Sequence, residues 1–115
     1  YEKSLSRFVK TPIYNKNITK PSFHQYIIRT KHRDELKDFL KRRGIETAIH
    51  YPKPIHLQKA YLQSFGKISL PKTEKNSKEI LSLPIHKSLT QKQLLFIVKN
   101  IKIFFQKNLK FKNEK

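Results

Sequence analysis

The side chains best suited to chemistry lie in one short segment, residues 46–58, which reads ETAIHYPKPIHLQ. It holds the imidazoles of His50 and His56 and the phenol of Tyr51, which donate and accept hydrogen bonds, and an imidazole titrates near neutral pH. Two prolines within the segment fix φ and remove backbone donors, so it cannot continue a sheet ladder. The spacing predicts a rigid corner that leaves a strand and presents polar side chains to a ligand.

Other roles for these side chains remain open from the sequence. The corner can be purely structural, with its histidines and tyrosine hydrogen-bonded to the backbone. A zinc site would require His50, His56 and a third ligand such as His24 or His86. Their spacing matches no standard zinc pattern, so no metal site is predicted.

The composition argues against a complete set of catalytic residues. The absence of cysteine excludes disulfides, thiolate metal ligands and a cysteine nucleophile. The only glycines, Gly44 and Gly66, are too far apart for a Gly-x-Ser-x-Gly nucleophile motif or a glycine-rich phosphate loop. We therefore predict no catalytic residue in this chain and expect the corner to be half of a site.

The 115 residues carry a formal net charge of +18, which raises the alternative of a basic nucleic-acid-binding module. The basic residues are, however, spread over every segment, and lysine, the weaker residue for bidentate phosphate recognition, outnumbers arginine. We therefore do not expect nucleic acid as a partner. No run of about 18 apolar residues is present to span a membrane. A chain without cysteine fits a reducing compartment, so we predict a cytoplasmic location.

Hydrophobic spacing predicts an α/β (α+β) fold with a small, mostly antiparallel sheet flanked by helices, in the element order β-β-α-β-α-α-α. Period-two alternation predicts strands at 23–30 and 45–51, with Tyr26 and Ile28 on one face of the first. The pattern alone leaves open whether these two strands pair parallel or antiparallel. Helical spacing predicts the following helices: 31–44, 55–65, 71–83 and 90–107. Residues 108–115 are expected to be a frayed tail.

Two of these helices have predicted ends and buried faces. Gly44 supplies the residue that ends the helix at 31–44, and Thr90 can cap the start of the last helix. The apolar stripe of the first of these helices consists of Leu36, Phe39 and Leu40. The last helix carries a continuous face that is predicted to be the most buried part of the chain: Leu94, Ile97, Val98, Ile101, Phe104 and Phe105.

Two longer runs resemble the C-terminal domain of the DegT-type, pyridoxal-phosphate-dependent sugar-nucleotide aminotransferases. They read FHQYIIRTKHRDELKDFLKRRGIETAIHYPKPIHLQKAY and LPKTEKNSKEILSLPIHKSLTQKQ, and the resemblance covers roughly residues 20–105. The shared features are an H-Y-P-x-P-x-H-x-Q corner, an R-D-x-L helix start and an LP-x-(T/A)-E … LSLP pair in the same order. The resemblance implies the type I aminotransferase fold, in which a large domain holds the cofactor and a small domain folds over it. Residues 1–115 would then be that single small domain, without the Schiff-base lysine.

The resemblance also implies a reaction. An amino group, usually from glutamate, is transferred through pyridoxal phosphate to the keto-sugar of a nucleoside-diphosphate sugar, in surface polysaccharide or amino-sugar biosynthesis. The cofactor would be held mainly by the large domain, and no cofactor-binding residue is assigned in this chain. The expected partners are the chain's own N-terminal large domain and a second copy in a homodimer. The isolated chain is expected to be inactive.

Carried onto this sequence, the family's corner makes Tyr51 and His56 the residues expected to face the substrate. His50 and His24 are further substrate-binding candidates, which can instead support the corner. Three more residues are expected to be structural: Arg29 as an ion-pair partner, and Glu74 and Ser82 as part of the packing.

Overall fold

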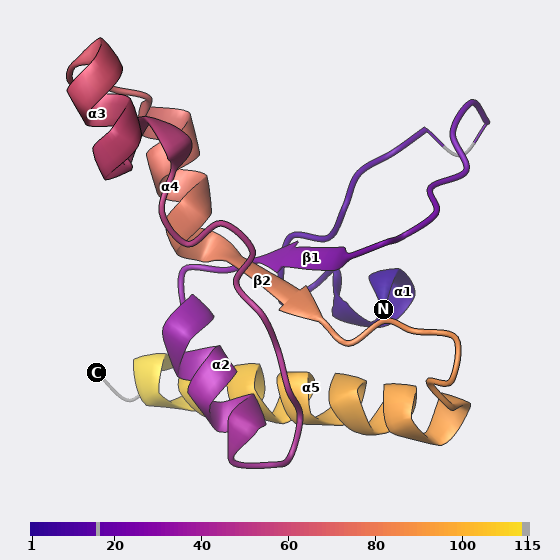
Figure 1. Cartoon of the computed structure of the whole chain (residues 1–115). Coiled ribbons are helices and arrows are strands. Elements are labelled where there is room, and N and C mark those ends of the chain that lie inside the picture. The colour runs from indigo at the N-terminus through magenta and orange to yellow at the C-terminus, as the bar shows by residue number, and fades with distance from the viewer. Residues whose placement is uncertain (16, 114–115) are drawn as a thin grey trace.

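The centre of the fold is a two-stranded antiparallel sheet (Figure 1). The computed structural model describes residues 1–15 and 17–113. The strands are β1 (Tyr26–Arg29) and β2 (Ile80–Leu83). The register pairs the first residue of β1 with the last of β2, so the two strands are paired over their whole length. The predicted small antiparallel sheet is therefore confirmed.

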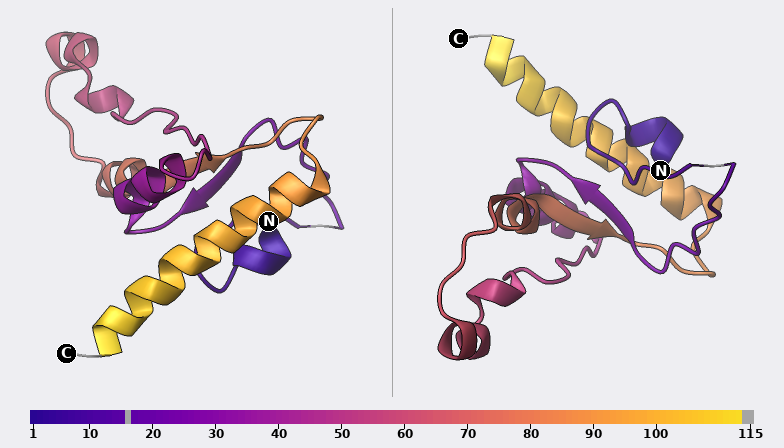
Figure 2. Two further views of the ribbon diagram at one scale, coloured as in Figure 1. Left: turned by 90° about the horizontal axis from the view of Figure 1, so that it is seen from below. Right: turned by 90° about the horizontal axis from the view of Figure 1, so that it is seen from above.

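Helices pack on one side of this sheet and project from it on the other (Figures 1 and 2). Their bounds are α1 Glu2–Leu5, α2 Arg33–Lys41, the 3-10 helix η1 Ile55–Leu57, α3 Lys59–Phe65, α4 Pro71–Glu79 and α5 Gln91–Asn113. The helices α1, α2 and α5 contribute side chains to one core with one face of the sheet, which confirms the fold of a small sheet flanked by helices. Within the described residues, none of the helices combines the length and the apolar character needed to cross a bilayer.

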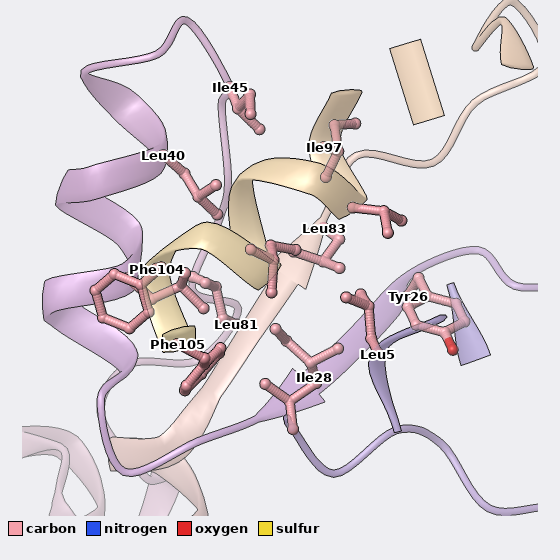
Figure 3. Packing of buried hydrophobic residues seen from close by; sticks show 14 residues of the cluster. Leu5, Tyr26, Ile28, Leu40, Ile45, Leu81, Leu83, Ile97, Phe104 and Phe105 are labelled. Carbon is pink, nitrogen blue, oxygen red and sulfur yellow. The ribbon is translucent and has the colours of Figure 1, made fainter. Parts of the chain in front are cut away.

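The core forms where the buried faces of the sheet and the helices meet (Figure 3). Tyr26 and Ile28 point into it, whereas Ile27 and Arg29 lie on the other face, as the period-two alternation predicted. Most residues of the predicted helix stripes are buried in this cluster, and Ile101 of α5 has no exposed surface, whereas Phe39 and Leu94 are half-buried and pack against it. The cluster consists of Leu5, Val9, Tyr26, Ile28, Leu36, Leu40, Ile45, Leu81, Leu83, Ile97, Val98, Ile101, Phe104 and Phe105.

Local capping sets the ends of two helices as predicted. Gly44 has φ of +70°, and its N–H donates to Lys41 O at 3.0 Å while that of Ile45 donates to Leu40 O at 3.0 Å. This pair of bonds is a Schellman motif, which needs a residue that tolerates positive φ. At the start of α5, Thr90 Oγ1 accepts the Gln93 N–H at 3.2 Å and the Gln93 side chain accepts the Thr90 N–H at 2.9 Å, a capping box.

Residues 80–83 were predicted to continue a helix, and this prediction was wrong. The helix α4 ends at Glu79, and Ile80 directly begins β2. Leu81 and Leu83 are buried against the core, and β2 pairs with a strand more than fifty positions earlier in the chain. Long-range pairing thus decides the conformation of a segment whose local pattern also fits a helix.

Four other predicted elements differ from the structure in extent. Residues 45–51 form no regular strand and pair with β2 only through a bridge between Ala48 and Ser82. The first strand of the predicted order, at residues 11–14, does not form, and the nearest pairing is one bridge between Lys10 and Arg29. The helix at 55–65 is divided by Gln58, whose ψ is 147°. The helix α5 continues to Asn113, past the predicted end at residue 107, and residues 114–115 of the predicted tail lie outside the described residues.

The face of the sheet that carries Ile27 and Arg29 does not pack against the core, and we call it the uncovered face. Two arms project from this face (Figures 1 and 2). One arm contains residues 10–15 and 17–25, and the other contains the corner, α3 and α4. The radius of gyration is 16.5 Å, above the ~13 Å expected for a compact domain of about 100 residues, because these arms extend away from the core. They also carry exposed apolar side chains, among them Ile13, Ile18, Ile55 and Phe65.

Candidate functional site

Tyr51 is the most unusual residue of the corner. Its φ is +61°, a left-handed conformation that sterically disfavours a bulky side chain, and its side chain is 76% exposed. Such a conformation persists only where the surrounding structure enforces it, and strained residues cluster at functional sites. The corner therefore presents an aromatic hydroxyl to the outside at the expense of local backbone strain.

Hydrogen bonds at both ends of the corner hold it against the rest of the chain. At one end, His50 Nδ1 lies 2.8 Å from the Ser82 hydroxyl of β2. At the other end, His56 Nε2 lies 3.2 Å from Glu74 Oε1 of α4, and an ionised carboxylate can only accept this bond. The two prolines between these ends stiffen the backbone and remove two of its N–H donors.

His56 was predicted to face the substrate, and the structure places it inside the corner. Its side chain is only 4% exposed, and its Nε2 is bound to Glu74. This leaves Nδ1 as the ring nitrogen that can meet a ligand. A direct contact between His56 and a substrate stays a prediction, whereas the contact with Glu74 is a structural role that the sequence did not reveal.

Glu74 joins the corner to the start of α4. Its Oε1 accepts a hydrogen bond from the Leu70 N–H at 3.0 Å as well as the bond from His56. The Leu70 N–H first, and then the His56 side chain, lower the pKa of the Glu74 carboxyl below its usual value. Glu74 is therefore ionised at neutral pH and remains a hydrogen-bond acceptor for His56. These contacts agree with the structural role expected from the sequence.

The corner lines a cavity of about 560 Å³ between α3, α4 and the uncovered face of the sheet. The structure brings His50, Tyr51 and His56 together around it. Most of the remaining lining residues are apolar or aromatic: Ile27, Pro54, Ile55, Tyr61, Ile68, Leu70 and Ile80. The others are polar: Gln25, Thr73, Asn76 and Ser77. Few convergent polar groups in an apolar cavity are typical of a site for a small organic ligand.

Sequence reasoning missed the polar residues Gln25, Thr73 and Asn76 that line this cavity. Gln25 had a signal, because the alternation in 23–30 puts it on the face opposite the buried one. Thr73 and Asn76 had none, because the orientation of α4 relative to the corner depends on the tertiary structure.

His24, the fourth predicted substrate residue, is exposed and does not line the cavity around Tyr51. It lines a neighbouring hollow of about 310 Å³ together with His50 and Ser82. His50 borders both hollows and so lies between His24 and Tyr51. The structure thus divides the four predicted residues into an exposed pair, Tyr51 and His24, and a hydrogen-bonded pair behind the corner.

The residues around the corner do not fit pyridoxal phosphate by themselves. The cofactor needs a lysine for its aldehyde and usually a close approach of backbone N–H groups to its phosphate. No lysine or glycine is among the residues that line the cavity. A side-chain carbon added at Gly44 or Gly66 would meet nothing within 4 Å, so neither glycine marks a close approach of backbone. Among the described residues, no three histidine, aspartate or glutamate side chains are grouped to hold a metal.

Arg29 forms the ion pair that the sequence suggested. Its guanidinium lies 3.0 Å from Glu79 Oε2 and joins the end of β1 to the end of α4. The hydrogen bond from Arg29 is the main cause that lowers the pKa of the Glu79 carboxyl. The pair stabilises the point where α4 passes directly into β2.

Comparison with known proteins confirms the resemblance. A model of the DegT/DnrJ/EryC1/StrS aminotransferase family matches residues 1–102. The chain is 44% identical over 85 residues to a "Pleiotropic regulatory protein" of Geobacillus stearothermophilus, which covers 73% of this chain and 23% of that protein. It is 42% identical over 81 residues to the dTDP-3-amino-3,4,6-trideoxy-alpha-D-glucose transaminase of Streptomyces venezuelae, covering 70% and 21%.

A solved structure gives the same result. The crystal structure of a DegT DnrJ EryC1 StrS aminotransferase from Brucella abortus superposes with a TM-score of 0.83 at 34% identity. The match covers 91% of this chain and 28% of that one. The chain therefore spans less than a third of the length of these relatives.

Proposed function

Because this chain belongs to the DegT/DnrJ/EryC1/StrS aminotransferase family, we propose that it forms the small domain of a larger sugar aminotransferase. Enzymes of this family depend on pyridoxal phosphate, which supplies the electron sink for moving an amino group. In the proposal, residues 1–115 form one wall of the substrate cleft. A large domain that holds the cofactor and its lysine forms the other wall.

The observation that carries the proposal is the strained and exposed Tyr51 at the edge of an apolar cavity. A tyrosine hydroxyl on a rigid corner suits a sugar hydroxyl or a diphosphate oxygen, because it can donate a hydrogen bond without a further loss of backbone freedom. The Streptomyces venezuelae relative, named as a dTDP-sugar transaminase, supports a nucleoside-diphosphate keto-sugar as the substrate. We assign Tyr51 to substrate contact, with His24, His50 and His56 as further substrate-binding candidates.

The remaining parts of the proposal concern the donor, the partners and the location. Glutamate is the proposed amino donor, and the isolated chain is inactive because its cavity has no lysine for the cofactor. We place the product in surface polysaccharide or amino-sugar biosynthesis and the reaction in the cytoplasm. The complete enzyme is proposed to be a homodimer.

The proposed large domain packs on the uncovered face of the sheet. The two arms leave apolar side chains exposed on that side, including Ile13, Ile55 and Phe65. Large exposed apolar side chains on one side of a molecule suit an interaction site. Docking of the large domain would cover these side chains and bring the cofactor opposite Tyr51.

The test is a kinetic and thermal comparison of variants of the complete enzyme with a keto-sugar nucleotide. Tyr51→Phe removes only the hydroxyl, and a lost hydrogen bond to a charged group lowers kcat/KM by about ten- to a hundred-fold, or ~1.5–3 kcal/mol. Its melting temperature should not change, because the side chain is exposed. Phe96→Ala, at an exposed aromatic position of α5, is the matched control and should leave the kinetics unaltered.

His56→Ala is the companion variant. If His56 contacts the substrate, kcat/KM of His56→Ala falls further than that of Glu74→Ala, which breaks the same hydrogen bond from the other side. If His56 serves only as the partner of Glu74, the two variants lose kcat/KM and thermal stability to the same extent. Unaltered kinetics in both Tyr51→Phe and His56→Ala would contradict the assignment of the corner to the substrate site.

A further inference from the structure

We propose that Glu74 and Ser82 are positioning residues, which act through His56 and His50 to hold Tyr51 in its left-handed, outward-facing conformation. The inference rests on the proposed function, because it assigns to Tyr51 the contact with the substrate. It deepens that function by naming two residues outside the corner that set its geometry. Neither residue needs to touch the substrate.

The two hydrogen bonds lie on opposite sides of Tyr51 along the chain. The bond between Ser82 and His50 lies one residue before Tyr51, and the bond between Glu74 and His56 lies five residues after it. Ser82 is buried, and Glu74 is fixed by a second bond from the Leu70 N–H at 3.0 Å. Ser82 and Glu74 are therefore each held by contacts other than those with the corner.

Both positioning residues belong to one continuous unit, α4 followed by β2. The helix α4 ends at Glu79 and β2 begins at Ile80, so no loop separates the two elements (Figure 1). The strand is anchored in the core by Leu81 and Leu83, and Arg29 clamps the junction through Glu79. The distance between the two attachment points is set by this rigid unit, and the corner must span it.

The backbone of Tyr51 is strained. A bulky residue at φ of +61° relaxes to a negative φ unless neighbouring contacts prevent it. The side chain of Tyr51 is largely exposed and cannot supply that restraint by its own packing. The restraint must come from the rest of the corner, which the hydrogen bonds of His50 and His56 hold on both sides of Tyr51.

The experiment measures φ of Tyr51 in the 115-residue chain by NMR, from its HN–Hα and one-bond Cα–Hα couplings. Glu74→Ala and Ser82→Ala are each expected to give the couplings of negative or averaged φ. Glu74→Gln should keep the wild-type couplings, because its amide oxygen can still accept from Leu70 and His56. Glu79→Gln is the matched control, since it alters a paired carboxylate of the same helix without a bond to the corner. If either alanine variant fails to fold, the other carries the test.

The second readout is steady-state kinetics of the same variants in the complete enzyme. A displaced Tyr51 weakens binding, so Glu74→Ala and Ser82→Ala should raise KM by about ten-fold with little change in kcat, and Glu74→Gln should restore KM. Wild-type couplings at Tyr51 in both alanine variants would overturn the inference. Altered couplings with unchanged KM in these variants and in Tyr51→Phe would keep the positioning role and refute the proposed function instead.

Discussion

Replacing Ile101 with aspartate tests whether α5 forms the centre of the core. Ile101 has no exposed surface, and it lies among the buried side chains of α1, α2 and the sheet. Loss of a fully buried isoleucine side chain removes ~1.5–3 kcal/mol of stability. At pH 7 the new carboxyl must also be buried neutral, which costs about 4 kcal/mol, from roughly three pKa units at ~1.36 kcal/mol each.

The sum of about 6 kcal/mol is comparable with the whole stability of a small domain, ~5–15 kcal/mol. Ile101→Asp is therefore expected to be largely unfolded at pH 7 and to recover partly at about pH 4, where the carboxyl is neutral without this penalty. Ile101→Val, which removes one methyl group, should lose ~0.5–1.5 kcal/mol and gives a measurable intermediate step.

The assay is thermal and urea unfolding followed by circular dichroism, at both pH values. Leu95→Asp is the matched control, because Leu95 lies on the same helix but is 55% exposed. It should lose less than about 1 kcal/mol. If Ile101→Asp and Leu95→Asp melt within a degree or two of each other, the α5 face is not in the core and the packing described above is wrong.

Three further outcomes are expected. Mixing the isolated chain with pyridoxal phosphate and reducing it with borohydride should label surface lysines at random, and one stoichiometric lysine adduct would contradict the proposed division of the site. Oligonucleotides should bind weakly, so a steep salt dependence with sub-micromolar affinity would instead favour the alternative of a nucleic-acid-binding module. Burial raises the pKa of Tyr26 to about 12, so its contribution to stability is present below pH 10 and is lost as the pH rises toward 12. Melting curves across that range should show a smaller alkaline loss for Tyr26→Phe than for the wild type.

The sequence alone determined the features that depend on neighbouring residues. The stripe of α2 and the long face of α5 follow from helical spacing, because residues three and four apart share a face. Gly44 and Thr90 end and begin their helices through bonds within a few residues. The motif order around the corner was also sufficient to identify the family, because it is carried by residue types rather than by their contacts.

The sequence also located the candidate site but not the roles within it. The prolines and the spacing of the corner indicated Tyr51 and His56 as site residues, and both line the same cavity. Only the structure shows that the first is exposed and the second buried against Glu74, eighteen positions away. A local sequence pattern does not predict which of the two side chains is exposed, because that depends on a partner from another element.

Tertiary structure alone decided the conformation of the segments with ambiguous local patterns. Residues 80–83 fit a helix by spacing, but pairing with β1 and burial of Leu81 and Leu83 stabilise a strand there. Residues 45–51 fit a strand, but only Ala48 finds a partner on the edge of β2 before the chain turns at Tyr51. In both segments the free energy of long-range contacts exceeds the small differences in local helix and strand propensity. A short segment of sequence contains information only about those propensities.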